Sequence, residues 1–220
     1  MSLQSNLSDI HNKIASAAEK SGRKKEDITL ICVSKTISAE VINEAVSLGE
    51  KIFGENRPQE LRDKFDNVEG ATWHLIGHLQ TNKVKYVVGK AKLIHSVDSI
   101  HLANAINERA EKENLVQDIL LEVNISGEES KYGLTIAQIP AIIKEIKLFK
   151  NLNFKGFMTM APLGAPEDEI RAIFKTAHNL FEEYKKDGAE ILSMGMSKDF
   201  EIAIEEGATH VRVGSAIFKR

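Results

Sequence analysis

Short apolar runs alternate along the chain with longer segments of helical periodicity. Strand-like runs, rich in β-branched and aliphatic residues, lie at 28–34, 51–54, 72–78, 92–97, 117–125, 153–160, 190–195 and 209–213. Segments with apolar residues at a spacing of three and four separate them, at 38–48, 57–66, 81–88, 99–113, 136–149, 166–186 and 198–206. This pattern predicts an α/β protein in which each strand is followed by a helix.

The order of these elements favours parallel strands, because a helical crossover returns the chain to the same edge of a sheet. With eight strand–helix units, a single (β/α)8 barrel is the leading architecture and a doubly wound open sheet is the alternative. An extra N-terminal helix precedes the first strand, with one apolar face formed by Leu3, Leu7, Ile10, Ile14 and Ala18. No linker-like stretch divides residues 1–220, so we expect one domain.

Composition is that of an ordinary soluble globular protein, and we expect a cytoplasmic location. It has 220 residues, of which 42% are hydrophobic and 28% charged, with a net charge of −3. This charge gives no general attraction to nucleic acid or anionic membranes, and no run approaches the roughly 20 apolar residues of a membrane span. The single cysteine, Cys32, cannot form an internal disulfide, which fits a reducing compartment.

The ends of the strands carry the candidate chemistry, because active sites of such barrels lie there. The first apolar run ends at Lys35. A lysine at this place often marks the exit of the chain into solvent. At the mouth of a pocket, however, a partly desolvated amine is a nucleophile, and the sequence of this stretch leaves both interpretations open.

Two corners near the end of the chain resemble anion sites. Ser197 precedes the helix predicted at 198–206 as its N-cap, and Gly214 follows the last strand, where a ligand can approach the backbone. Alternatively, Ser197 is only a cap and Gly214 only a turn. Side chains alternate between the two faces of a strand, so Arg212 and Val213 point in opposite directions. The Arg212 side chain either points into the site or forms a structural ion pair. His74 and His78 share a strand face without a third ligand, so no metal site is predicted.

Seven motifs in order then identify a family resemblance. They read "VSKT", "FGENRPQE", "HLIGHLQTNK", "VNISGEESKYGL", "GFMTMAP", "LSMGMSKD" and "VRVGSAIF", between residues 33 and 218. The chain resembles the pyridoxal 5′-phosphate homeostasis protein family, single-domain relatives of the alanine racemase barrel. The resemblance implies that pyridoxal 5′-phosphate (PLP) is the cofactor and that Lys35 holds it as a Schiff base.

The same resemblance assigns the rest of the cofactor site. It implies phosphate contacts from Ser197, Gly214 and Ser215, Arg212 beside the pyridine nitrogen, and Asn56, His78 and Met160 around the ring. It implies a protein that holds PLP and releases it to PLP-dependent apoenzymes, without catalytic residues, as a monomer or weak dimer.

Two enzymatic alternatives stay open at this point. One is a PLP-dependent amino-acid racemase; by resemblance, such racemases take a second acid–base tyrosine from an additional C-terminal domain of the partner subunit. We expect no such domain after the eighth strand, and Tyr132 is the one tyrosine expected near the site. The other alternative is a Schiff-base aldolase that uses the lysine and the phosphate corners without a cofactor.

Overall fold

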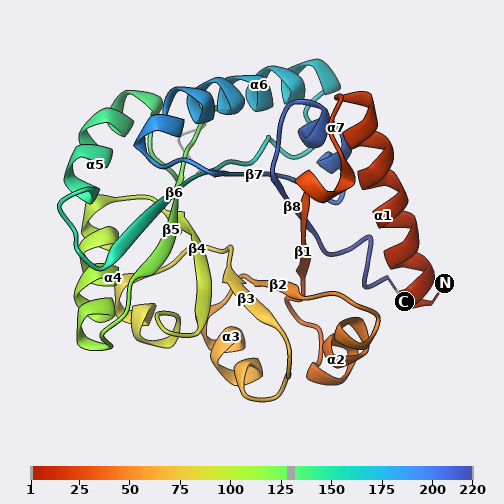
Figure 1. The fold of residues 1–220 in the computed structure, drawn as a ribbon, viewed down its shortest axis with the longest axis horizontal. Helices are drawn as coiled ribbons and strands as arrows, with labels where there is room; N and C mark the ends of the chain where they lie inside the picture. Colours follow the sequence, from red (N-terminus) through yellow and green to blue (C-terminus); the bar gives the residue numbers. More distant parts are fainter. Residues whose placement is uncertain (1, 128–131, 220) are drawn as a thin grey trace.

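The eight predicted strands form a closed parallel barrel (Figure 1). The computed structural model describes residues 2–127 and 132–219. The strands are β1 (Thr29–Val33), β2 (Ile52–Glu55), β3 (Thr72–Leu75), β4 (Ala91–Val97), β5 (Gln117–Glu122), β6 (Leu152–Met158), β7 (Ile191–Met196) and β8 (His210–Val213). They pair in chain order, and β8 pairs with β1. The barrel prediction is confirmed, and the alternative of an open doubly wound sheet is wrong.

Helices surround the barrel in the order of the chain (Figure 1). They are α1 (Leu3–Lys20), α2 (Ala39–Ser47), α3 (Pro58–Phe65), α4 (Ile100–Lys112), α5 (Ile139–Ile146), α6 (Glu167–Glu183) and α7 (Phe200–Glu205). The predicted N-terminal helix is α1, which packs beside α7. Its predicted apolar face is confirmed, since Leu7, Ile10 and Ile14 are buried.

Short 3-10 helices account for the differences from the predicted helices. The segment expected at 81–88 is the 3-10 helix η2 (Thr81–Tyr86), because β-branched Val87 and Val88 and then Gly89 disfavour an α-helix there. The predicted helix 136–149 starts as the 3-10 helix η3 (Ile136–Gln138), and α5 follows with Pro140 in its first turn. Two further 3-10 helices are η1 (Lys25–Asp27) and η4 (Lys185–Asp187).

The apolar core lies mainly between the strands and the helices. Inside the barrel a smaller apolar cluster of Leu93, Leu120 and Met158 is present. Buried polar side chains, including His74, His95, Ser193 and Arg212, occupy part of the remaining interior. Barrel interiors are usually filled by branched aliphatic residues, so this polar interior needs a functional or structural explanation. In the described part of the chain, no helix is both long and apolar enough to cross a bilayer.

Candidate functional site

A cavity of about 410 Å³ lies at the carboxyl-terminal ends of the strands. Segments that follow β1, β2, β3, β6, β7 and β8 line it, so residues far apart in the sequence meet there. Seven of the predicted site residues are in its lining: Lys35, Asn56, Met160, Ser197, Arg212, Gly214 and Ser215. The barrel therefore brings most of the predicted site together around one space.

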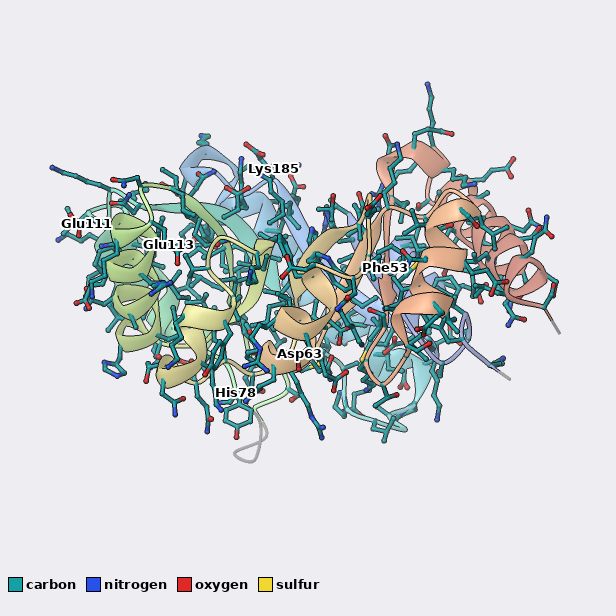
Figure 2. The ribbon with its side chains drawn as sticks, turned by 90° about the horizontal axis from the view of Figure 1, so that it is seen from below. Phe53, Asp63, His78, Glu111, Glu113 and Lys185 are labelled. Atoms are coloured by element: carbon teal, nitrogen blue, oxygen red, sulfur yellow. The ribbon has the colours of Figure 1, made fainter. Side chains whose placement is uncertain are left out.

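His78 lies outside this cavity. It lines a neighbouring polar cleft of about 530 Å³, which Asn56 also borders. Its ring stacks on Tyr132 with centroids 3.9 Å apart, and its Nδ1 lies 3.3 Å from a carboxylate oxygen of Asp98. In Figure 2, His78 lies at the lower end of the barrel, opposite Lys185. His78, with Tyr132 stacked on it, therefore lies at the neighbouring cleft and not in the cavity itself.

Lys35 occupies a turn directly after β1. The turn lies between β1 and α2 and is closed by a hydrogen bond of 3.0 Å from Ile37 N–H to Ser34 O. Lys35 lines the cavity and is exposed in this structure. The physical reason is its place in the turn, beyond the last strand residue Val33 and outside the packed barrel interior.

Arg212 enters the cavity from the barrel interior. Its guanidinium donates to Ser193 Oγ at 2.6 Å and to Thr159 O at 3.0 Å. Burial lowers its pKa to about 10, although the charges of Glu122 and Asp199 oppose that shift, so the side chain is cationic at neutral pH. No carboxylate among the described residues forms an ion pair with it. The cation is thus held by neutral acceptors and faces the cavity.

A chain of hydrogen bonds continues from Ser193 into the barrel. Ser193 Oγ lies 3.0 Å from His95 Nδ1, and His95 Nε2 lies 3.0 Å from His74 Nδ1. Burial lowers the pKa of His95 well below its ordinary value and that of His74 to about 3, so both rings are neutral at neutral pH. Because Ser193 Oγ accepts from Arg212, its own hydrogen can be donated to His95 Nδ1, and His95 Nε2–H can donate to His74.

The corner between β7 and β8 differs from its predicted form. Helix α7 begins at Phe200 with Asp199 at the N-cap, so the prediction that Ser197 caps it is wrong. Asp199 Oδ1 accepts from Met196 N–H at 2.6 Å, which ends β7 in a tight turn. Ser197 Oγ instead accepts from Gly214 N–H at 3.2 Å, joining the two corners. A hydroxyl that accepts in this way keeps its own hydrogen for a ligand.

Gly214 is required by close packing at this corner. A Cβ at Gly214 would lie 3.0 Å from both Cβ and O of Val33. Such contacts are tighter than ordinary packing, so any side chain there would push β8 away from β1. The absence of a side chain keeps the backbone beside Ser197 and Ser215 in reach of a ligand.

Two charged residues of the cavity were missed by sequence reasoning. Lys198 and Asp199 line it directly after Ser197. The sequence feature that could have indicated them is the "KD" that ends the motif "LSMGMSKD", because it places a cationic side chain beside the anion site predicted at Ser197. Burial raises the pKa of Asp199, and hydrogen bonding to Met196 N–H opposes this shift. Across residues 2–127 and 132–219, no cluster of three potential metal ligands is present.

Comparison with known proteins agrees with this architecture. Residues 5–220 match the family model of the alanine racemase N-terminal domain. A pyridoxal phosphate homeostasis protein of Aquifex aeolicus is 42% identical over 217 residues, covering 96% of this chain and 95% of that protein. The relative of that name in Escherichia coli K12 is 36% identical over 223 residues, covering 97% and 94%.

Solved structures show the same fold. PipY of Synechococcus elongatus, solved with PLP bound, superposes with a TM-score of 0.86 at 31% identity, over 99% of this chain and 100% of that one. These matches cover both the family domain and nearly the whole length of the curated relatives. The chain belongs to the pyridoxal phosphate homeostasis protein family.

Proposed function

We propose that this protein binds PLP through a Schiff base with Lys35 and releases it to PLP-dependent apoenzymes. The observation that carries the proposal is the cavity that gathers Lys35, Arg212 and the Ser197–Gly214 corner around one space. Bound PLP supplies an aldehyde, which condenses with a neutral amine with loss of water. Each of the three protein groups matches one part of such a ligand.

The residues present fit the ligand in size and chemistry. A volume of about 410 Å³ lies within the range of cofactor sites, about 300–1,000 Å³. The Ser197 hydroxyl and the backbone N–H of Ser215 are the donors offered to the phosphate, and Gly214, whose own N–H donates to Ser197 Oγ, lets the phosphate approach the backbone closely. Arg212 carries only donors, so it presents N–H groups to the ring nitrogen and has no proton acceptor for it. Asn56 and Met160 line the remaining wall, and His78 acts from the neighbouring cleft.

A carrier role is favoured over catalysis by the surroundings of the site. A racemase needs acid–base groups on both faces of the substrate carbon. Tyr132, the tyrosine expected near the site, stacks on His78 and is 60% exposed beside the neighbouring cleft. We therefore assign no catalytic residue, and the names of the relatives, which concern homeostasis, support this assignment.

The remaining parts of the proposal concern organisation and location. Residues 1–220 act as one PLP-binding domain, as a monomer or weak dimer in the cytoplasm. The contiguous family match over residues 5–220 supports the single domain. The sole cysteine, Cys32, is a buried free thiol, which suits a reducing compartment.

A transfer assay tests this function. The protein is loaded with PLP, freed of excess ligand and mixed with a PLP-dependent apoenzyme whose activity reports the cofactor it receives. The proposal predicts a visible absorption band on loading and recovery of the apoenzyme's activity. A protein that never acquires the band, or that retains its PLP in the presence of the apoenzyme, contradicts the proposal.

A further inference from the structure

The turn that carries Lys35 has an unfavourable backbone conformation. Lys35 and Thr36 are the two central residues of the turn between Ser34 and Ile37. Thr36 has φ of +63°, in the left-handed region where a β-branched residue is a genuine outlier. A turn with positive φ at its third residue normally takes glycine or asparagine there. Contacts from outside the turn must therefore hold Thr36 in place.

Two carboxylates hold the residues on either side of Lys35. The hydroxyl of Ser34 donates to Glu55 Oε1 at 2.7 Å. The backbone N–H of Thr36 donates to Glu60 Oε2 at 2.9 Å. Glu55 ends β2 and Glu60 lies in α3, so the turn is fixed to two neighbouring elements.

Lys64 of α3 contacts both carboxylates and the turn itself. Its ammonium donates to Glu55 Oε1 at 2.8 Å, to Glu60 Oε2 at 3.3 Å and to Ser34 O at 2.8 Å. The three acceptors match the three hydrogens of an ammonium group. The Lys64 side chain is 13% exposed, and Lys64 is not part of the cavity lining. One partly buried cation outside the cavity thus connects both carboxylates to the turn.

We propose that Lys64 is the positioning residue for Lys35, holding the strained turn in the conformation that presents the Lys35 amine to the cavity. The inference rests on the proposed function, because it concerns the capture of an aldehyde by Lys35. Covalent capture requires the amine at a defined place relative to the aldehyde carbon. The groups assigned to the phosphate, Ser197, Gly214 and Ser215, follow β7 and β8, and none of the Lys64 hydrogen bonds given above reaches them.

The charges of the cluster determine how the experiment is designed. Burial raises the pKa of Glu55, and hydrogen bonds from Lys64 and Ser34 oppose that shift. Glu55 is fully buried, and its Oε2 has no hydrogen-bond partner within the described part of the chain. Removal of Lys64 alone leaves an uncompensated buried carboxylate. A Lys64→Met/Glu55→Gln double variant removes both charges and protects the test against simple misfolding.

The experiment compares two ligands on folded variants. PLP reports covalent capture, and 4-deoxypyridoxine 5′-phosphate, which carries a methyl group in place of the aldehyde, reports the remaining contacts. For Lys64→Met and for the double variant we expect PLP affinity to fall by about tenfold to a hundredfold, since a displacement of about 1 Å can cost that much. Affinity for the deoxy analogue should stay at the wild-type value. Lys155→Met, which removes a lysine paired with Glu190 at 2.9 Å, is the matched control and should change neither affinity.

The possible outcomes are distinct. If both folded Lys64 variants bind PLP with wild-type affinity, the inference is overturned. It is also overturned if the affinities for PLP and for the analogue fall equally, because that result indicates general damage to the cavity. If borohydride treatment of the PLP-treated wild-type protein leaves Lys35 unmodified, the proposed function itself fails. A wild-type protein modified at Lys35, with Lys64 variants that lose affinity for PLP alone, supports the inference.

Discussion

The guanidinium of Arg212 donates a hydrogen bond of 2.6 Å to the hydroxyl of Ser193. This contact orders the polar interior of the barrel. Because Ser193 accepts from a permanent donor, its own hydrogen is available to His95, and the chain continues to His74 between two rings that burial keeps neutral. His210 stacks against His74 at a centroid distance of 6.5 Å, and burial also lowers its pKa, to about 4. Three neutral imidazoles therefore lie beneath the cavity.

These histidines predict loss of stability in mild acid. Their pKa values are lowered in the folded state, so below about pH 6.5 the unfolded chain binds more protons than the folded protein. Stability present above pH 6.5 should fall as the pH decreases toward about 4, by about 1.4 kcal/mol per pH unit for each histidine. Urea unfolding of the ligand-free protein at several pH values measures this slope.

Substitution of one ring isolates its contribution to that slope. His95→Gln should reduce the pH dependence by about one proton, because the unfolded chain then has one group fewer to protonate. His101→Gln, at an exposed position of α4, is the matched control and should leave the slope unchanged. Identical slopes for His95→Gln and the wild type would refute the neutral assignment.

Ser197→Ala should weaken PLP binding without abolishing it. The substitution removes a hydroxyl that accepts from Gly214 and can donate to the phosphate. A hydrogen bond to a charged group contributes about 1.5–3 kcal/mol, so the Kd should rise by about tenfold to a hundredfold. Equilibrium titration with PLP and with pyridoxal, which lacks the phosphate, separates this contact from the rest. An unchanged Kd for PLP would mean that Ser197 only supports the backbone of Gly214.

Lys198 should contribute to phosphate binding by its charge alone. It is exposed at the cavity and follows Ser197, and Asp199 beside it has the opposite charge. Exposed charge interactions contribute about 0.2–1 kcal/mol, so Lys198→Ala should raise the Kd for PLP by up to about fivefold. The effect should shrink at high salt. Lys175→Ala, an exposed lysine of α6, should have no effect at any ionic strength.

Much of the fold follows from the strand ends and the spacing between them. Lys35, Asn56, Met160 and Gly214 could be placed at one end of a barrel because parallel strands all end on the same side. The sequence predicted Ser197 as the N-cap of α7, but its hydroxyl accepts from Gly214 N–H instead. Ser197 and Asp199 are both good N-cap residues, and the turn at Met196 decides between them.

The polar interior could not be predicted from the sequence. His95 and Ser193 are 98 residues apart, and their contact depends on closure of the barrel and on strand register. The left-handed backbone conformation of Thr36 could not be predicted either, because threonine is disfavoured at positive φ and no local sequence pattern indicates it there. Contacts of Lys64 with Glu55 and Ser34 hold that turn, and they exist only after β2 and α3 pack beside β1.

Amino-acid turnover by the loaded protein should be negligible. Among the charged residues described in the cavity lining, Lys35, Lys198, Asp199 and Arg212, only Lys35 has been assigned to the reacting end of the ligand. Lack of a positioned second acid–base group costs about 10²–10⁴-fold. Incubation with L-alanine in deuterated water should give little deuterium at the α-carbon and almost no D-isomer. Turnover of about 1 s⁻¹, within the ordinary range of enzymes, would contradict the carrier role and make Tyr132→Phe the next variant.

Location of the covalent link tests the central claim most directly. The protein is incubated with PLP, reduced with borohydride and digested, and the peptides are sequenced by mass spectrometry. The account predicts a pyridoxyl phosphate group on the peptide that contains Lys35, and no stable labelling in Lys35→Ala. A wild-type protein labelled at Lys198 or another lysine while Lys35 stays unmodified would contradict it.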